Sequence, residues 1–117
     1  MAFTTGPGML DAVVLSVVSK QPQGTYGYKI TQDVRSVIEV SESTLYPVLR
    51  RLQKDGALET YDQAFAGRNR RYYKITPFGR RQLEQWLAEW EEYKAKIEQV
   101  FYGQAFTQAE DEGGREL

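Results

Sequence analysis

Arginine and lysine are the residues of this chain whose types and spacing most clearly indicate chemistry. The stretch from Gly67 to Arg81 contains six basic residues and no acidic one: Arg68, Arg70, Arg71, Lys74, Arg80 and Arg81. Clustered guanidinium and ammonium groups can bind the phosphates of a nucleic acid, but a run of charge taken alone favours an ordinary solvated basic surface, so both interpretations stay open at this point. The sequence has no histidine and no cysteine. This excludes imidazole and thiolate catalysis, disulfides and Cys/His zinc sites.

The formal net charge of −1 hides two regions of opposite sign. Residues 1–81 carry 12 basic and 7 acidic side chains, whereas residues 82–117 carry 3 and 9. The chain therefore has a basic body and an acidic C-terminal segment, and an acidic segment of this kind would be repelled by phosphates if the body binds a nucleic acid. Because no pair of acidic residues lies on an apolar helix face, we expect neither enzymatic activity nor a cofactor.

The length of 117 residues predicts one folded unit. No stretch resembles a secretion signal, and none approaches the about 20 apolar residues of a membrane-spanning helix. We therefore expect a cytoplasmic protein without a membrane partner.

Three helices are expected before the basic cluster. Apolar residues at the spacing of one helix face predict helices over about residues 9–20 and 42–55. Between them a helix is expected over about residues 25–37, with Thr25 as N-cap and Tyr28 among its apolar contacts. The core stripe of the third helix is Leu45, Val48, Leu49 and Leu52, and its opposite face carries Ser43, Pro47, Arg50 and Lys54. Ser41 or Ser43 can cap the start of this helix. Since proline belongs in a first turn, Pro47 indicates either a late start at Ser43 or a local kink, and we favour the late start.

A β-hairpin and a long helix follow. Alternating residues predict strands over residues 58–62 and 70–75, joined by a loop over residues 64–69. Thr76 and Pro77 predict the N-cap and first position of a helix that reaches about Phe101.

The apolar residues of this last helix recur about every 3.5 residues. At 1.5 Å per residue the helix is about 37 Å long, more than the rest of so small a chain can cover. The pattern therefore favours a symmetric homodimer, and a helix end frayed on its own chain is the alternative.

Three helices and a basic hairpin follow one another as in a winged helix-turn-helix, a mainly α fold with a small antiparallel β-hairpin. In that fold the third helix enters the major groove, and the hairpin, expected to carry its arginines on a flexible tip, touches the flanking backbone. The predicted DNA-binding residues are Tyr26, Lys29, Ser43, Thr44, Tyr46, Arg50, Arg51, Lys54, Arg68, Asn69, Arg70 and Arg71. A winged helix that binds only another protein is the alternative.

Two segments resemble motifs of the PadR family of bacterial transcriptional regulators. The first runs from STLYPVLRRL at residues 43–52 to Gly56, and the second covers residues 67–79 and ends in RRYYKITPFG. The resemblance covers about residues 9–101 and is strongest with short, single-domain members. It implies a dimeric repressor on a palindromic DNA operator, with the long C-terminal helix forming the dimer.

In the drug-responsive short members of that family, a pore at the dimer interface holds planar ligands against a tryptophan, and Trp90 stands at the matching position. Lys94 stands where those relatives carry an acidic residue. The expected ligand-binding or dimer-interface residues are Ala12, Leu83, Trp86, Leu87, Trp90, Tyr93, Lys94 and Ile97. Trp86 is interpreted as dimer core, and Trp90 as dimer core or ligand contact. A small aromatic effector is therefore a candidate partner.

The expected organisation has three parts. Residues 1–76 form the DNA-binding domain, residues 77–102 the dimerisation helix and residues 103–117 a flexible acidic tail.

Overall fold

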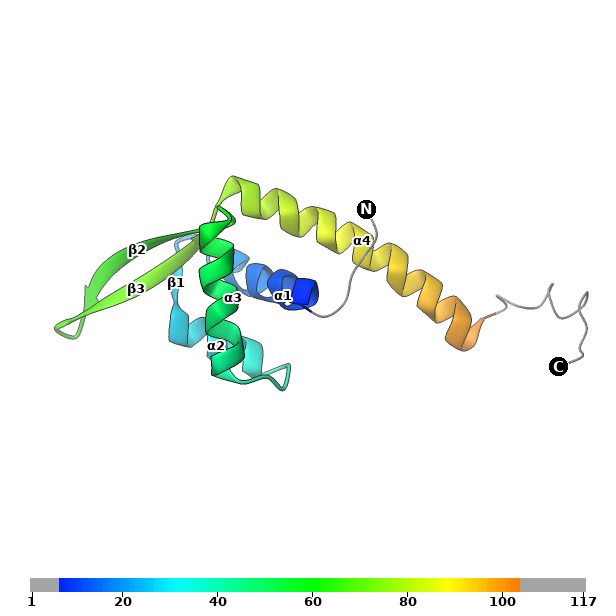
Figure 1. The fold of residues 1–117 in the computed structure, drawn as a ribbon, viewed down its shortest axis with the longest axis horizontal. Coiled ribbons are helices and arrows are strands. Elements are labelled where there is room, and N and C mark those ends of the chain that lie inside the picture. Colours follow the sequence, from blue (N-terminus) through cyan, green and yellow to red (C-terminus); the bar gives the residue numbers. More distant parts are fainter. Residues whose placement is uncertain (1–6, 104–117) are drawn as a thin grey trace, which may run out of the picture.

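The computed structural model describes residues 7–103. Its elements are α1 (Pro7–Ser19), β1 (Thr25–Tyr26), α2 (Gly27–Arg35), α3 (Glu42–Lys54), β2 (Leu58–Phe65), β3 (Arg68–Ile75) and α4 (Pro77–Tyr102). Within residues 7–103, four helices and a small antiparallel sheet confirm the predicted fold class (Figure 1). Apart from Gly103, the predicted tail lies outside the described residues.

The sheet has a third strand that the sequence patterns do not predict. Its strand order is β1-β3-β2, and Thr25 and Tyr26 pair with Tyr73 and Tyr72 of β3. The predicted N-cap role of Thr25 is therefore wrong, because Thr25 is a buried strand residue and α2 begins only at Gly27. Two residues are too few to show a strand period, so only the pairing with β3 defines β1.

The hairpin of β2 and β3 turns at Ala66 and Gly67, whose φ angles of 53° and 78° are both positive. Positive φ at both positions is typical of the two-residue turns that suit the twist of a hairpin. Strand pairing continues up to Phe65 and Arg68 on the two sides of the turn. The predicted loop is thus too long, and Arg68 lies in a strand instead of on a flexible tip.

Helix α3 begins at Glu42, so the favoured late start at Ser43 is wrong, and of the two predicted caps Ser41 is the one that forms. The Ser41 hydroxyl accepts a hydrogen bond from the Thr44 backbone N–H at 3.2 Å. Pro47 consequently lies inside the helix. Ser43 and Pro47 are both exposed, so water can satisfy the Ser43 carbonyl group that proline leaves without a donor.

The core lies between α1, α2, α3 and the base of the hairpin. Leu45 and Leu49 of α3 are 0% exposed, as their spacing predicts. Tyr28 is different: it is 55% exposed and makes no core contact of the kind predicted. The reason is the later start of α2, which places Tyr28 in the exposed first turn.

The start of α4 is joined closely to the body. The Thr76 hydroxyl accepts from the Gly79 N–H at 2.9 Å and donates to the Gly56 carbonyl at 2.6 Å, which confirms Thr76 as the N-cap. A side chain on Gly79 would collide with the backbone carbonyl of Ala57. Glycine at this position therefore lets the first turn of α4 approach the body.

The remainder of α4 runs over α1 and then extends beyond the body (Figure 1). Leu83 is buried, whereas Leu87 is 47% and Phe101 67% exposed. None of the helices within residues 7–103 is both long enough and apolar enough to cross a membrane.

Candidate nucleic-acid interface

The N-terminus of α3 presents a cluster of hydroxyl groups. The Ser41 Oγ atom lies 3.0 Å from the Oγ atom of Ser43 and 3.0 Å from the Oγ1 atom of Thr44. Ser43 and Thr44 are exposed, as contact with DNA requires. The positive end of the helix dipole favours phosphate at this position.

Arg50 and Lys54 continue this exposed face toward the C-terminus of α3. Neither has an ion-pair partner among residues 7–103. Both side chains are therefore available to phosphates, in agreement with their predicted position.

Arg51 is oriented differently from the predicted groove contact. Its Nη2 atom donates to a carboxylate oxygen of Asp11, so Arg51 ties α3 to α1. Burial raises the pKa of Asp11 above its usual value, while the hydrogen bond and charge of Arg51 act in the opposite direction.

Tyr46 turns toward α2. It is half-buried and packs against the core, and a side chain on Gly27 would lie 3.2 Å from its ring. Burial, followed by the charge of Glu42, raises the pKa of the Tyr46 hydroxyl. The hydroxyl therefore stays protonated near neutral pH and can donate a hydrogen bond.

Lys29 lies on the outer side of α2. Its Nζ atom is 3.2 Å from a carboxylate oxygen of Asp33 one turn later, and both side chains are more than 40% exposed. An exposed pair of this kind is weak, and the ammonium group, which bonds to both carboxylate oxygens of Asp33, keeps at least one donor for a phosphate.

Arg70 is held in a fixed place in the wing, defined here as β2 and β3. Its guanidinium carbon lies 3.6 Å from the centre of the Tyr26 ring and 3.8 Å from that of Phe65. Its Nη2 atom donates to the Tyr72 hydroxyl at 2.7 Å. Stacking between two rings restrains Arg70, so the wing is tied to β1 through this side chain.

The other wing residues are more exposed. Arg71 pairs with Asp62 across the two strands at 3.4 Å, and Arg68 and Asn69 lie exposed next to the turn. A hollow of about 430 Å³ between the wing, α2 and α3 is lined by Tyr26, Gly27, Tyr28, Tyr46, Asn69, Arg70, Arg71 and Tyr73. The fold thus brings several of the predicted DNA-binding residues to one surface.

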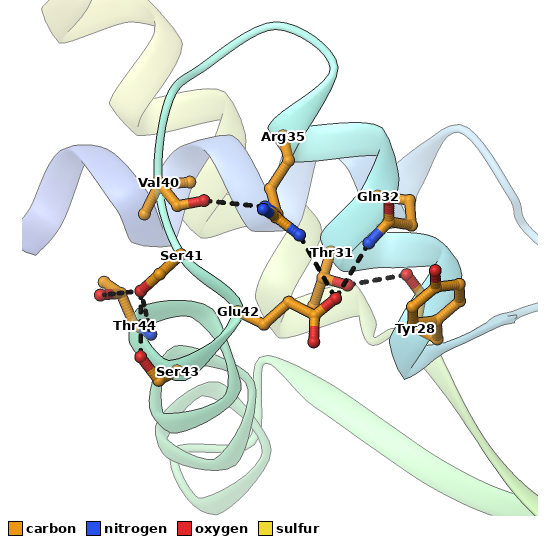
Figure 2. Close-up of polar contacts among 9 residues, drawn as sticks. All are labelled: Tyr28, Thr31, Gln32, Arg35, Val40, Ser41, Glu42, Ser43 and Thr44. Carbon is orange, nitrogen blue, oxygen red and sulfur yellow. Dashed lines mark hydrogen bonds and ion pairs between the residues drawn. The ribbon is translucent and has the colours of Figure 1, made fainter.

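A polar group that sequence patterns do not reveal joins α2 to the start of α3 (Figure 2). The Gln32 Nε2 and Arg35 Nη1 atoms donate to the same oxygen of Glu42, Oε2, at 3.0 and 3.3 Å. The Arg35 Nε atom also donates to the Val40 carbonyl at 3.0 Å. No short motif contains these residues, and the acidic first turn of α3 is the only local signal.

The predicted ligand and interface residues separate into three places. Leu83 belongs to the core of its own chain, because it follows Gly79 by one turn, where α4 lies closest to the body. An apolar pocket of about 340 Å³ between α1, α2 and α4 is lined by Met9, Ala12, Val13, Ser16, Val17, Asp33, Val34, Val37, Ile38, Trp86, Leu87 and Trp90. Tyr93, Lys94 and Ile97 lie further along α4 and border a second hollow of about 240 Å³. Lys94 pairs with Glu91 at 3.2 Å.

Comparison with known proteins identifies relatives of this fold. The crystal structure of smu.1704 from Streptococcus mutans superposes with a TM-score of 0.76 at 37% identity, over 88% of this chain and 95% of that one. A PadR family transcription regulator from Clostridium difficile superposes with a TM-score of 0.71 at 31% identity, over 82% of this chain and 100% of that one. The transcriptional regulator Rv3488 of Mycobacterium tuberculosis is 44% identical over 59 residues, which are 50% of this chain and 55% of that protein.

The assignment to a family rests on the sequence of the winged helix. Residues 14–85, more than half of the chain, match the sequence model of the PadR-like transcriptional regulators. This range includes α2, α3 and the wing, the elements that carry the candidate interface. The chain therefore belongs to the PadR-like family of transcriptional regulators.

Proposed function

We propose that this DNA-binding transcriptional regulator is a homodimeric repressor whose affinity for a palindromic operator changes when a small planar aromatic ligand binds at the dimer interface. The observation that carries the proposal is the apolar stripe of α4, which continues past its own body and borders an apolar pocket. Residues 1–76 would bind DNA in the cytoplasm, and residues 77–102 would form the dimer.

The exposed stripe supports dimerisation. Leu87, Val100 and Phe101 are 47%, 51% and 67% exposed, although they continue the apolar pattern that begins at Leu83. Apolar surface of this extent is costly in water unless another surface covers it. A second copy presents the same stripe, so a two-fold axis would make the two helices complementary.

The position of α3 supports recognition of a palindrome. Each copy in such a dimer presents one α3 N-terminus, with the hydroxyls of Ser43 and Thr44 and the cation of Arg50 exposed beside it. Two recognition helices of a symmetric dimer read half-sites about 34–36 Å apart, one turn of the duplex. Arg68, next to the turn of the wing, would contact the flanking phosphates.

The apolar pocket supports a planar ligand. Trp86 and Trp90 line it from α4, and the aliphatic side chains of α1 form the opposite wall. An indole offers a flat face on which an aromatic ring stacks. Such a ligand changes DNA affinity only as far as it prefers one arrangement of the dimer over another.

Fluorescence of the tryptophans tests the ligand site. Menadione, a planar naphthoquinone, is titrated into wild type, Trp90→Ala and Trp86→Phe, with binding of the operator duplex measured in parallel. We expect saturable quenching in wild type and in Trp86→Phe, a weaker response in Trp90→Ala, and altered operator affinity only where quenching saturates. Equal quenching of wild type and Trp90→Ala would argue against a site at Trp90.

A further inference from the structure

The first residue of α3 carries a carboxylate at the surface that faces DNA in the proposed function. Glu42 directly precedes Ser43 and Thr44, and 39% of its side chain is exposed. The negative charge of Glu42 interacts favourably with the positive end of the helix dipole, but it would be repelled by the phosphates of bound DNA. A carboxylate at this position is therefore unexpected unless it also makes a favourable contact.

Two side chains of α2 hold this carboxylate in one orientation. Gln32 and Arg35 both donate to Oε2, at 3.0 and 3.3 Å, so the carboxylate is restrained from one side. Arg35 also bonds to the Val40 carbonyl, which ties the turn before α3 to the same group. The positive charge of Arg35 offsets the carboxylate charge against the phosphates of the groove.

The other carboxylate oxygen, Oε1, makes no hydrogen bond with residues 7–103. In Figure 2 both dashed lines reach one oxygen of Glu42, and the second oxygen points away from Gln32 and Arg35. A carboxylate oxygen can only accept hydrogen bonds. A restrained acceptor at the start of a recognition helix is suited to a base that presents a donor in the major groove.

We propose that Glu42 determines sequence specificity by accepting a hydrogen bond, through Oε1, from the N4 amino group of a cytosine in each half-site. Adenine also presents an amino group, but its N7 acceptor lies beside that group and repels a carboxylate. Gln32 and Arg35 are positioning residues, because they act by holding Glu42. The inference depends on the proposed binding of α3 in the major groove.

Selection from a random duplex pool tests this assignment. Wild type, Glu42→Gln and Glu39→Gln are each used to enrich bound sequences, and thermal unfolding confirms that each variant is folded. In Glu42→Gln the amide oxygen can keep the bonds to Gln32 and Arg35, so an amide N–H replaces the outward acceptor. We expect wild type to enrich cytosine at one symmetric position, and Glu42→Gln to enrich guanine or thymine there. Replacing that cytosine should weaken wild-type binding about tenfold.

The control Glu39→Gln and one further variant, Gln32→Ala, separate base reading from a structural role. Glu39→Gln removes the same charge from the exposed turn before α3, and its selected sequences should equal those of wild type. Gln32→Ala keeps the Glu42 carboxylate but removes one of its supports, so it should broaden the preference at the same position only. Identical profiles in wild type, Glu42→Gln and Gln32→Ala would overturn the assignment of Glu42. A wild-type pool without any enriched sequence would instead contradict the proposed function.

Discussion

At the start of α3 and in the wing, side chains are bonded to partners within the same chain: Glu42 to Gln32 and Arg35, and Arg70 to the rings of Tyr26 and Phe65. Along the second half of α4, apolar side chains remain exposed. The candidate DNA-binding surface is thus shaped by a single chain, whereas the apolar stripe of α4 remains partly exposed on that chain. In the proposed function, the surface that reads DNA and the surface that forms the dimer therefore have separate structural origins.

The largest effect is expected from a charge placed in the uncovered stripe. Ile97→Glu would bury an unpaired carboxylate in the dimer and weaken dimerisation by about 3–5 kcal/mol. Sedimentation equilibrium should then show monomers at concentrations where wild type is dimeric. Gln99→Glu adds the same charge on an exposed position away from the stripe and should remain dimeric. Dimers of equal affinity in both variants would place the dimer contact elsewhere.

A smaller effect is expected at the joint between the body and α4. Gly79→Ala forces a methyl group against the Ala57 carbonyl, and such overpacking costs about 2–3 kcal/mol of the free energy of unfolding. Gly56→Ala, where φ is +85° but nothing lies close, should cost about 1 kcal/mol. Urea unfolding monitored by circular dichroism measures both values. If Gly56→Ala proved the more harmful change, close packing would not be the reason for glycine at residue 79.

Two neighbouring arginines of α3, Arg50 and Arg51, should contribute differently to DNA binding. In the proposed dimer, Arg50→Ala should lower affinity for all duplexes and reduce the magnitude of the slope of log affinity against log salt by about 2, since one phosphate contact is lost from each of the two chains. Arg51→Ala removes a side chain that is bonded to Asp11, so the slope should stay close to that of wild type. Binding measured over a salt series distinguishes them. A larger loss of slope in Arg51→Ala would show that this arginine leaves Asp11 to bind DNA.

The smallest effect concerns pH. Burial raises the pKa of Asp11, so the folded chain binds the proton more tightly than the unfolded chain does. As pH falls from neutral through the raised pKa toward about 4, wild type should therefore gain stability relative to Asp11→Asn. Urea unfolding of both proteins at several pH values tests the sign. A relative loss over that range would mean that the charge of Arg51 outweighs burial.

The sequence predicts well those helices in which apolar residues recur at a regular spacing over several turns. The leucines of α3 lie in the core and Thr76 begins α4, because helix periodicity and capping are local properties. The predicted N-cap role of Thr25 is wrong because the strand that contains Thr25 exists only through pairing with Tyr73, far along the chain. The contacts of Arg51 and Arg70 likewise depend on other elements, so residue type indicates their chemistry but not their partners. The role of Glu42 is not predicted at all, because its partners lie on α2.

Sedimentation velocity of the chain on its selected duplex tests the central claim most directly, namely that one chain shapes the reading surface and two chains bind the operator. We expect two chains on each duplex, and a steep loss of affinity when one half-site is scrambled, because the two α3 helices act through the α4 dimer. A single chain on each duplex, bound equally well when one half-site is scrambled, would contradict the account.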